Sequence, residues 1–178
     1  LIDSTFATPV NQCPLDYGVD LVVHSCTKYL GGHNDLMAGS VCGKAGIVSA
    51  IKEFRDVVGT NSDPNTAWLL IRGIKTLALR MQQQNTSAQT IAEYLEGHDK
   101  VQRVFYPGLA SHPDHAIAKA QMKGYGGVVS FEIDGDRERT RQFVEALQIP
   151  YLAPSLGGAE TLVSHPATVS YSDLSEED

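Results

Sequence analysis

The segment of residues 21–35 constrains the fold more than any other part of the chain. It starts with the apolar run Leu-Val-Val of residues 21–23, passes through Ser25, Thr27 and Lys28, and continues into a pair of glycines. A short apolar run bounded by polar residues and glycines is typical of a buried strand that ends in a turn. The segment therefore predicts a strand whose carboxyl end presents two hydroxyls and an amine at one edge of a sheet.

A carboxylate lies in a similar setting near the start of the chain. Asp3 follows a short hydrophobic stretch, and residues 8–20 separate it from the next apolar run. Parallel strands need a crossover of about a dozen residues or more, usually with a helix. Residues 14–18 are suited to a short helix that a glycine ends. Because open α/β sheets bind ligands at the carboxyl ends of their strands, we expect Asp3 and Lys28 to lie at one ligand-binding edge.

This combination of side chains suits pyridoxal 5'-phosphate (PLP). PLP needs a lysine that forms a Schiff base with its aldehyde, donors that hold its phosphate, and a carboxylate that keeps its pyridine nitrogen protonated. Lys28, the hydroxyls of Ser25 and Thr27, and the carboxylate of Asp3 offer these groups. The alternative is an ordinary surface lysine together with an ordinary turn carboxylate, which the joint pattern disfavours.

Longer motifs resemble those of the cystathionine gamma-synthase family, the Cys/Met-metabolism branch of fold-type I PLP enzymes. The matching stretches extend along the whole chain: residues 3–9, 22–35, 82–85, 106–109, 126–132 and 154–160. The resemblance implies that Lys28 carries the cofactor and that Asp3 pairs with the pyridine nitrogen. It also implies that Ser25 and Thr27 hold the phosphate, and that Ser155 lies beside the amino-acid end of the substrate.

The activity that the resemblance implies is γ-replacement in methionine biosynthesis (transsulfuration). The thiol of cysteine replaces the activating group of a homoserine ester, which gives cystathionine, while Lys28 moves the protons. Residues 8–12, 126–135 and 149–155 resemble plant-type synthases most closely, and Pro154 stands where many bacterial synthases and several lyases have glutamate. Two alternatives stay open: a PLP-dependent lyase acting on cystathionine or methionine, and a fragment that keeps the fold without activity.

The hydrophobic pattern predicts further strands and helices along the chain. We expect a strand over residues 37–42, a helix over 47–58, and one long helix from Pro64 to about Glu96 in which Gly73 is a kink or a close-packing point. After residue 97 the pattern alternates between strands and helices, at residues 101–106, 112–122, 127–133 and 137–147.

An alternating pattern of this kind predicts an α/β fold. With the resemblance, it indicates the C-terminal part of a fold-type I PLP-dependent transferase. Residues 1–72 are expected to be the C-terminal part of the PLP-binding large domain, an aminotransferase-like remnant that includes the Schiff-base lysine. Residues 73–178 are expected to form a small C-terminal α/β domain that is truncated at its end.

Chains of this family carry further parts of the site outside the stretch seen here. The resemblance places a Gly-rich phosphate loop and a ring-stacking tyrosine before it, and an arginine for the substrate carboxylate after it. We therefore expect these 178 residues to be an internal part of a longer enzyme that assembles as a homotetramer, a dimer of dimers. The fragment alone is expected to be inactive.

Composition limits the other classes of function. A formal charge of −7 disfavours nucleic acid as a partner, and no apolar stretch approaches the ~20 residues of a membrane-spanning helix. Cys13, Cys26 and Cys42 form no CxxC pair, and the imidazoles of His112 and His115 have no evident further ligands, so no metal site is predicted. We expect amino-acid substrates, and either the cytoplasm or, for a plant protein, the plastid stroma as the compartment.

Overall fold

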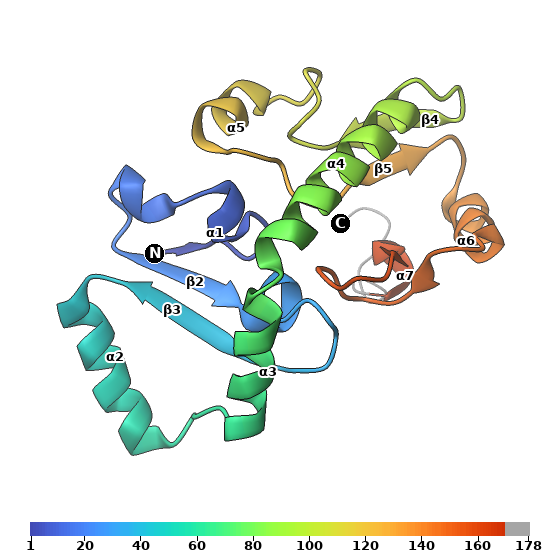
Figure 1. The fold of residues 1–178 in the computed structure, drawn as a ribbon. Coiled ribbons are helices and arrows are strands. Elements are labelled where there is room, and N and C mark those ends of the chain that lie inside the picture. Colours follow the sequence, from blue (N-terminus) through green and yellow to red (C-terminus); the bar gives the residue numbers. More distant parts are fainter. Residues whose placement is uncertain (170–178) are drawn as a thin grey trace.

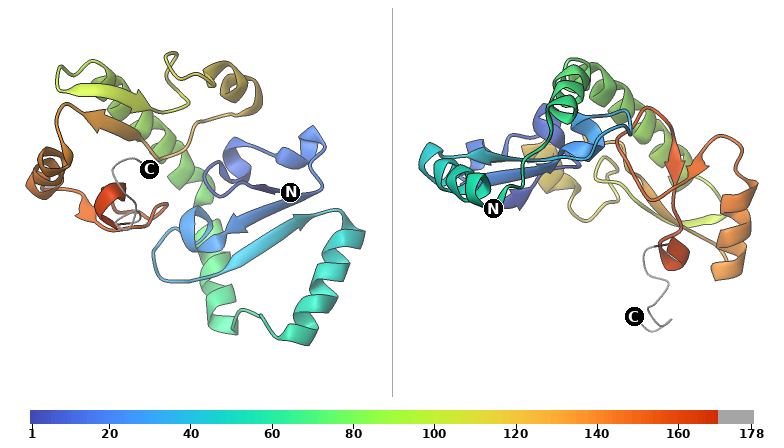
Figure 2. Two further views of the ribbon diagram at one scale, coloured as in Figure 1. Left: turned by 180° about the vertical axis from the view of Figure 1, so that it is seen from behind. Right: turned by 90° about the horizontal axis from the view of Figure 1, so that it is seen from below.

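The computed structural model describes residues 1–169. Its amino-terminal strands lie at one end of the long helix α4 (Leu77–Glu96), and the strands of residues 101–105 and 130–133 lie toward the other end (Figure 1). The views from behind and from below show the same division (Figure 2). The chain therefore mixes strands and helices as an α/β fold, which is the predicted class.

The amino-terminal sheet has the strand order β1-β2-β3. Strand β1 (Ile2–Asp3) runs parallel to β2 (Leu21–Ser25), and β3 (Gly39–Gly43) runs antiparallel to β2. The crossover between the parallel strands contains α1 (Thr8–Asn11) and the short helix η1 (Pro14–Tyr17). Gly18 ends η1 with φ of +81°, a conformation that glycine adopts without steric cost. Parallel pairing and the short helix confirm the predicted crossover.

Two helices follow this sheet. Helix α2 (Ala45–Val58) ends at Gly59 as predicted, and α3 (Pro64–Ile74) begins after Asp63, whose carboxylate accepts hydrogen bonds from the backbone of the first turn. A carboxylate at this position satisfies amide groups that have no partner inside the helix. Strand β3 begins two residues later than the pattern predicts, at Gly39.

The prediction of one helix from Pro64 to Glu96 is wrong, because the chain breaks between α3 and α4. Thr76 has non-helical angles, with φ of −106° and ψ of 3°. The carbonyl of Gly73 accepts from the backbone N–H and the hydroxyl of Thr76, each at 3.2 Å, and from Arg80 Nη2 at 2.9 Å. These bonds tighten the turn and take the place of the regular helical bond from the next turn.

The remaining strands form two small sheets. Strand β4 (Val101–Phe105) pairs antiparallel with β5 (Ser130–Ile133), and α5 (His115–Gln121) and α6 (Arg137–Ala146) follow the predicted alternation. The sequence pattern did not predict β6 (Tyr151–Leu152) and β7 (Leu162–Val163), which pair in parallel, or α7 (Pro166–Val169). Strands of two residues are too short to show a period.

Helix α4 contributes to both hydrophobic cores. Its first turns place Leu77 and Met81 against Cys26, Tyr29 and Leu30 of the turn after β2. Its later turns pack two alanines against side chains that follow β4: Ala88 and Ala92 against Tyr106 and Leu109. The division of the chain into domains at residues 72 and 73 stays a prediction.

Gly73 provides a test of the packing beneath α3. A Cβ at this position would collide with the carbonyl oxygen of Gly31 and would lie 2.9 Å from that of Leu30. We therefore expect Gly73→Ala to lower the free energy of unfolding of the full-length protein by about 1–3 kcal/mol in chemical denaturation. Gly46→Ala in α2 is the matched control, since a Cβ there meets nothing within 4 Å and should be neutral or stabilising. Equal effects of the two changes would contradict the close approach.

Candidate active site

Lys28 lies in a tight turn directly after strand β2. The turn η2 (Cys26–Leu30) is wound more loosely than an α-helix, and Lys28 interrupts it with φ of −89° and ψ of −123°. Its neighbours Cys26 and Tyr29 are buried in the first core, and burial raises the pKa of both side chains. Arg80 Nη1 donates to the carbonyl of Tyr29 at 2.8 Å. The lysine is therefore held by a backbone that is anchored on both sides.

The amine of Lys28 points to Ser155, which comes from the loop between β6 and β7. Lys28 Nζ donates to Ser155 Oγ at 3.1 Å, a contact between residues that are 127 positions apart. Gly157 lets this loop cross the lysine turn closely: its φ is +83°, and a Cβ there would lie 2.5 Å from the backbone nitrogen of Tyr29. The structure thus brings together two residues that the sequence analysis named separately.

Asp3 and Ser25 end the two parallel strands, and Thr5 connects them. The backbone N–H of Ser25 donates to Thr5 Oγ1 at 2.8 Å, and the N–H of Thr5 donates to Asp3 Oδ1 at 2.8 Å. The hydroxyl of Thr5 lowers the pKa of Asp3 most, by hydrogen bonding, and the backbone N–H of Thr5 lowers it further. Nearby His24 contributes in the same direction. Asp3 is therefore kept ionised. Sequence reasoning missed Thr5, although it lies in the motif of residues 3–9.

Thr27 contacts the chain entering β3. Thr27 Oγ1 accepts from the N–H of Ala38 at 3.1 Å and donates to its carbonyl at 3.4 Å. Ser25 and Thr27 are both half-buried at the carboxyl end of β2. Their hydroxyls are thus close in the chain to Lys28, although that of Thr27 is already in contact with the backbone.

A cavity of about 340 Å³ opens beside the Asp3 end of this arrangement. Its lining combines the start of the chain with the segment before β5, and includes Asp3, Phe6, Tyr29, Tyr125 and Gly127. Lys28 and Ser155 do not line it. The cavity therefore borders the carboxylate of Asp3 but not the amine of Lys28.

Comparison with known proteins decides the family. A family model described as "Cys/Met metabolism PLP-dependent enzyme" matches residues 1–178. The chain belongs to this family. The fold of its described residues is accordingly that of part of a fold-type I PLP enzyme, as predicted.

Plant proteins are among the similar relatives of this Cys/Met metabolism family member. The chain is 59% identical to cystathionine gamma-synthase 1, chloroplastic, of Arabidopsis thaliana, over 99% of the chain and 31% of that relative. It is 47% identical to a cystathionine beta-lyase of Lactococcus lactis subsp. cremoris, over 99% of the chain and 47% of that relative. The chain thus spans 31% and 47% of the length of these two relatives.

Solved structures agree with this family membership. A cystathionine gamma synthase of Xanthomonas oryzae pv. oryzae, solved in complex with aminoacrylate and cysteine, superposes with a TM-score of 0.93 at 42% identity. The match covers 98% of this chain and 46% of that one.

The side chains of the site fit the cofactor of the family. PLP presents an aldehyde, a phosphate and a protonated pyridine nitrogen. The chain offers an amine on a fixed turn (Lys28), hydroxyls at the end of the same strand (Ser25 and Thr27), and a carboxylate whose pKa is lowered (Asp3). Each chemical group of the cofactor therefore has a complementary group at this edge of the sheet.

Within residues 1–169, no three side chains of His, Cys, Asp or Glu converge in a way that could hold a metal ion. None of the helices in that range has both the length and the apolar character needed to cross a membrane.

Thr5 provides a test of the connection between Asp3 and Ser25. Thr5→Val keeps the shape of the side chain but leaves the N–H of Ser25 without its acceptor and removes a donor to Asp3. We expect a loss of about 1–3 kcal/mol in the free energy of unfolding, a higher pKa of Asp3, and weaker PLP binding by absorbance titration of the full-length protein. Thr5→Ser retains the hydroxyl and should behave like the wild type. If valine and serine variants bind PLP equally, Thr5 has no such role.

Proposed function

We propose that the full-length protein is a PLP-dependent cystathionine gamma-synthase. It would replace the ester group of an activated homoserine by the thiol of cysteine and release the acid of that ester. The observation that carries this proposal is the order of similarity among the relatives. Identity is 59% and 58% to two plant synthases, against 47% to cystathionine beta-lyases of Lactococcus lactis and 43% to an L-methionine gamma-lyase of Fusobacterium nucleatum.

The cofactor and the strand ends have separate tasks in this proposal. When bound, PLP supplies an electron sink that stabilises negative charge beside the amino-acid nitrogen. The carboxylate of Asp3, ionised because Thr5 donates to it, would pair with the protonated pyridine nitrogen. The hydroxyls of Ser25 and Thr27 would hold the phosphate and fix the position of the ring.

Lys28 and Ser155 would carry the proton transfers. With its amine free, Lys28 would take the protons of the substrate's Cα and Cβ in turn, which lets the ester group leave Cγ. It would return protons to these two carbons once the thiol has added. The amine of Lys28 donates a hydrogen bond to the hydroxyl oxygen of Ser155 at 3.1 Å. This bond fixes the orientation of the amine and so the direction in which its lone pair or other hydrogens point. Once the ester group has left, the sulfur of cysteine bonds to Cγ in its place.

A lyase would use the same residues, and a product assay separates the two. The full-length protein is supplied with the phosphate, succinyl and acetyl esters of homoserine, each with and without cysteine, and separately with cystathionine and with methionine. We expect cystathionine from ester plus cysteine, and 2-oxobutanoate only when cysteine is withheld. Cleavage of cystathionine or methionine at a higher rate would replace the synthase proposal by a lyase. The preferred ester identifies the leaving group.

Assembly and compartment extend the proposal to the whole protein. We infer a homotetramer, a dimer of dimers, whose sites are shared between subunits, and sedimentation of the full-length protein tests it. A stable monomer with normal turnover would contradict shared sites. The names of the two chloroplastic plant relatives support the plastid stroma as the compartment.

A further inference from the structure

The loop that carries Ser155 has no long secondary structure to fix it. It runs between two strands of two residues each, β6 and β7, and its contact with Lys28 is one hydrogen bond. A hydroxyl on such a loop directs an amine only if the loop itself is held against the lysine turn. The contacts that hold it therefore decide whether Ser155 and Lys28 meet.

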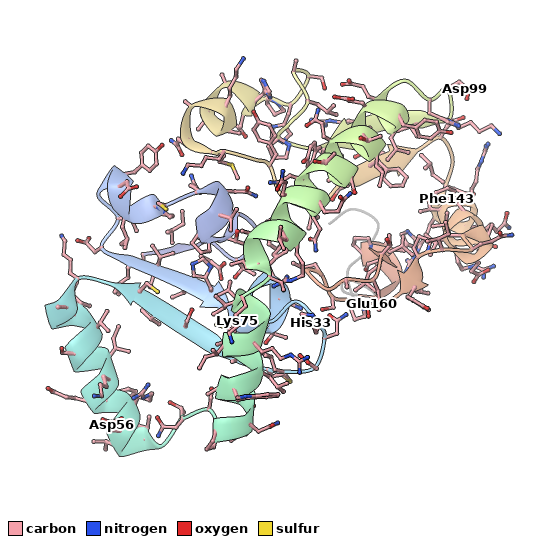
Figure 3. All side chains as sticks on the ribbon, in the orientation of Figure 1. His33, Asp56, Lys75, Asp99, Phe143 and Glu160 are labelled. Atoms are coloured by element: carbon pink, nitrogen blue, oxygen red, sulfur yellow. The ribbon has the colours of Figure 1, made fainter. Side chains whose placement is uncertain are left out.

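Leu156 packs this loop against the core that contains Cys26 and Tyr29 of the lysine turn, and two polar groups outside the proposed chemistry bind the loop beyond it. Gln84 of α4 donates from Nε2 to the carbonyl of Gly158 at 3.1 Å. Asn34, on the segment that follows the lysine turn, donates from Nδ2 to Glu160 Oε2 at 2.7 Å. Figure 3 shows Glu160 on the side of the molecule where His33, the residue before Asn34, is labelled.

The bond between Asn34 and Glu160 closes a ring of contacts. Two short chain segments form the sides of this ring. One runs from Lys28 to Asn34 and contains the glycine pair, and the other runs from Ser155 to Glu160 and contains Gly157 and Gly158. One end of the ring is the bond from Lys28 to Ser155, and the other is the bond from Asn34 to Glu160. A carboxylate acceptor makes the second bond charge-assisted, in a setting where both side chains are exposed to water.

The backbone of Asn34 makes the bond selective for this residue type. Asn34 has φ of +56°, in the left-handed region where asparagine, aspartate and glycine are favoured over other residues. Its side chain also lies where a Cβ on Gly158 would stand, so Gly158 gives it room to reach the carboxylate. Asparagine is the residue of the three that can also donate to Glu160 at neutral pH.

We propose that Asn34 and Glu160 are positioning residues that hold the Ser155 loop against the lysine turn and so keep the Ser155 hydroxyl on the Lys28 amine. This inference rests on the proposed function, because it gives the pair a task in directing the proton-moving amine. Neither residue touches the reacting atoms in this role. Their effect should therefore pass through Ser155 and disappear when the Ser155 hydroxyl is absent.

The test reverses donor and acceptor in the full-length protein loaded with PLP. Asn34→Asp keeps the left-handed backbone but sets one carboxylate against another. We expect kcat to fall about tenfold, and the pH midpoint of the visible absorbance of the bound cofactor to shift, with little change in thermal unfolding. The double variant Asn34→Asp/Glu160→Gln restores a donor facing a carboxylate and should recover both readouts. Asn61→Asp, the same charge change in the exposed loop before α3, should alter neither.

A double-mutant cycle with Ser155→Ala tests whether the effect of Asn34→Asp on kcat acts through the Ser155 hydroxyl. In that background Asn34→Asp should cause less than a twofold further change. A full tenfold effect without the Ser155 hydroxyl, or no rescue in the double variant, would overturn the positioning role. If the wild-type protein forms no visible band with PLP, the proposed function itself fails. If the wild type forms the band and Asn34→Asp leaves kcat and the band unchanged, only the inference is wrong.

Discussion

Replacing Lys28 by alanine in the full-length protein is expected to abolish the visible absorbance of the Schiff base between this lysine and PLP, and to lower kcat/KM by about 10⁴-fold. Two functions of one amine would be lost. The covalent link to the cofactor depends on a lysine, and positioned proton transfer contributes about 10²–10⁴-fold by itself. A spectrum after incubation with PLP and dialysis measures the first loss, and steady-state kinetics measures the second.

Lys52 in α2 provides the matched control for this substitution. It is exposed, lies far along the chain from the site, and Lys52→Ala removes the same charge from a helix. We expect the spectrum and the kinetics of this control to match those of the wild type. A Lys28→Ala protein that keeps the visible band would remove Lys28 from its assigned position.

Asp3→Asn is the second substitution for which a large effect is expected. Asparagine has the same shape but no charge, so the pyridine nitrogen loses the anion that keeps it protonated. We expect PLP to bind more weakly but measurably, and kcat to fall by about 10²–10³-fold, as for the loss of one preorganised electrostatic contact. Absorbance titration with PLP gives the affinity, and turnover at saturating PLP gives kcat. Full activity of the variant would exclude Asp3 from the mechanism.

The dependence on pH distinguishes the charge of Asp3 from its shape. The hydroxyl and backbone N–H of Thr5 lower the pKa of Asp3 below its ordinary value of 3.8. A carboxyl with a lowered pKa loses its charge only as the pH falls through that lowered value. We therefore expect the wild type to keep the contribution of Asp3 throughout the range above about pH 5. The deficit of Asp3→Asn should accordingly be constant across that range.

The edge of the sheet was predictable from short stretches of sequence. The polar residues after each apolar run, and the length of the crossover between them, placed Asp3 and the lysine turn at the ends of parallel strands. These are local features, since a run of apolar residues and the turn that ends it lie within a dozen positions. The predicted alternation beyond residue 97 was confirmed for the same reason.

Features that depend on distant contacts were not predictable in this way. At the break between α3 and α4, Arg80 and Thr76 bind the carbonyl of Gly73, while the sequence marked Gly73 only as a kink or a close-packing point within one continuous helix. The contact of Lys28 with Ser155 joins positions 127 apart, and only the resemblance to a family pointed to Ser155. Thr5 was missed because its hydroxyl acts across two strands.

Reduction of the PLP-loaded full-length protein with borohydride tests the central assignment most directly. The reduction fixes the cofactor irreversibly to the lysine that carries it, and peptide mass spectrometry then locates the added mass. We expect that mass on Lys28, in the peptide that contains the segment of residues 21–35, with no label when Lys28→Ala is treated in the same way. Label on another lysine of the wild type, or an unlabelled protein that is nevertheless active with PLP, would contradict the assignment.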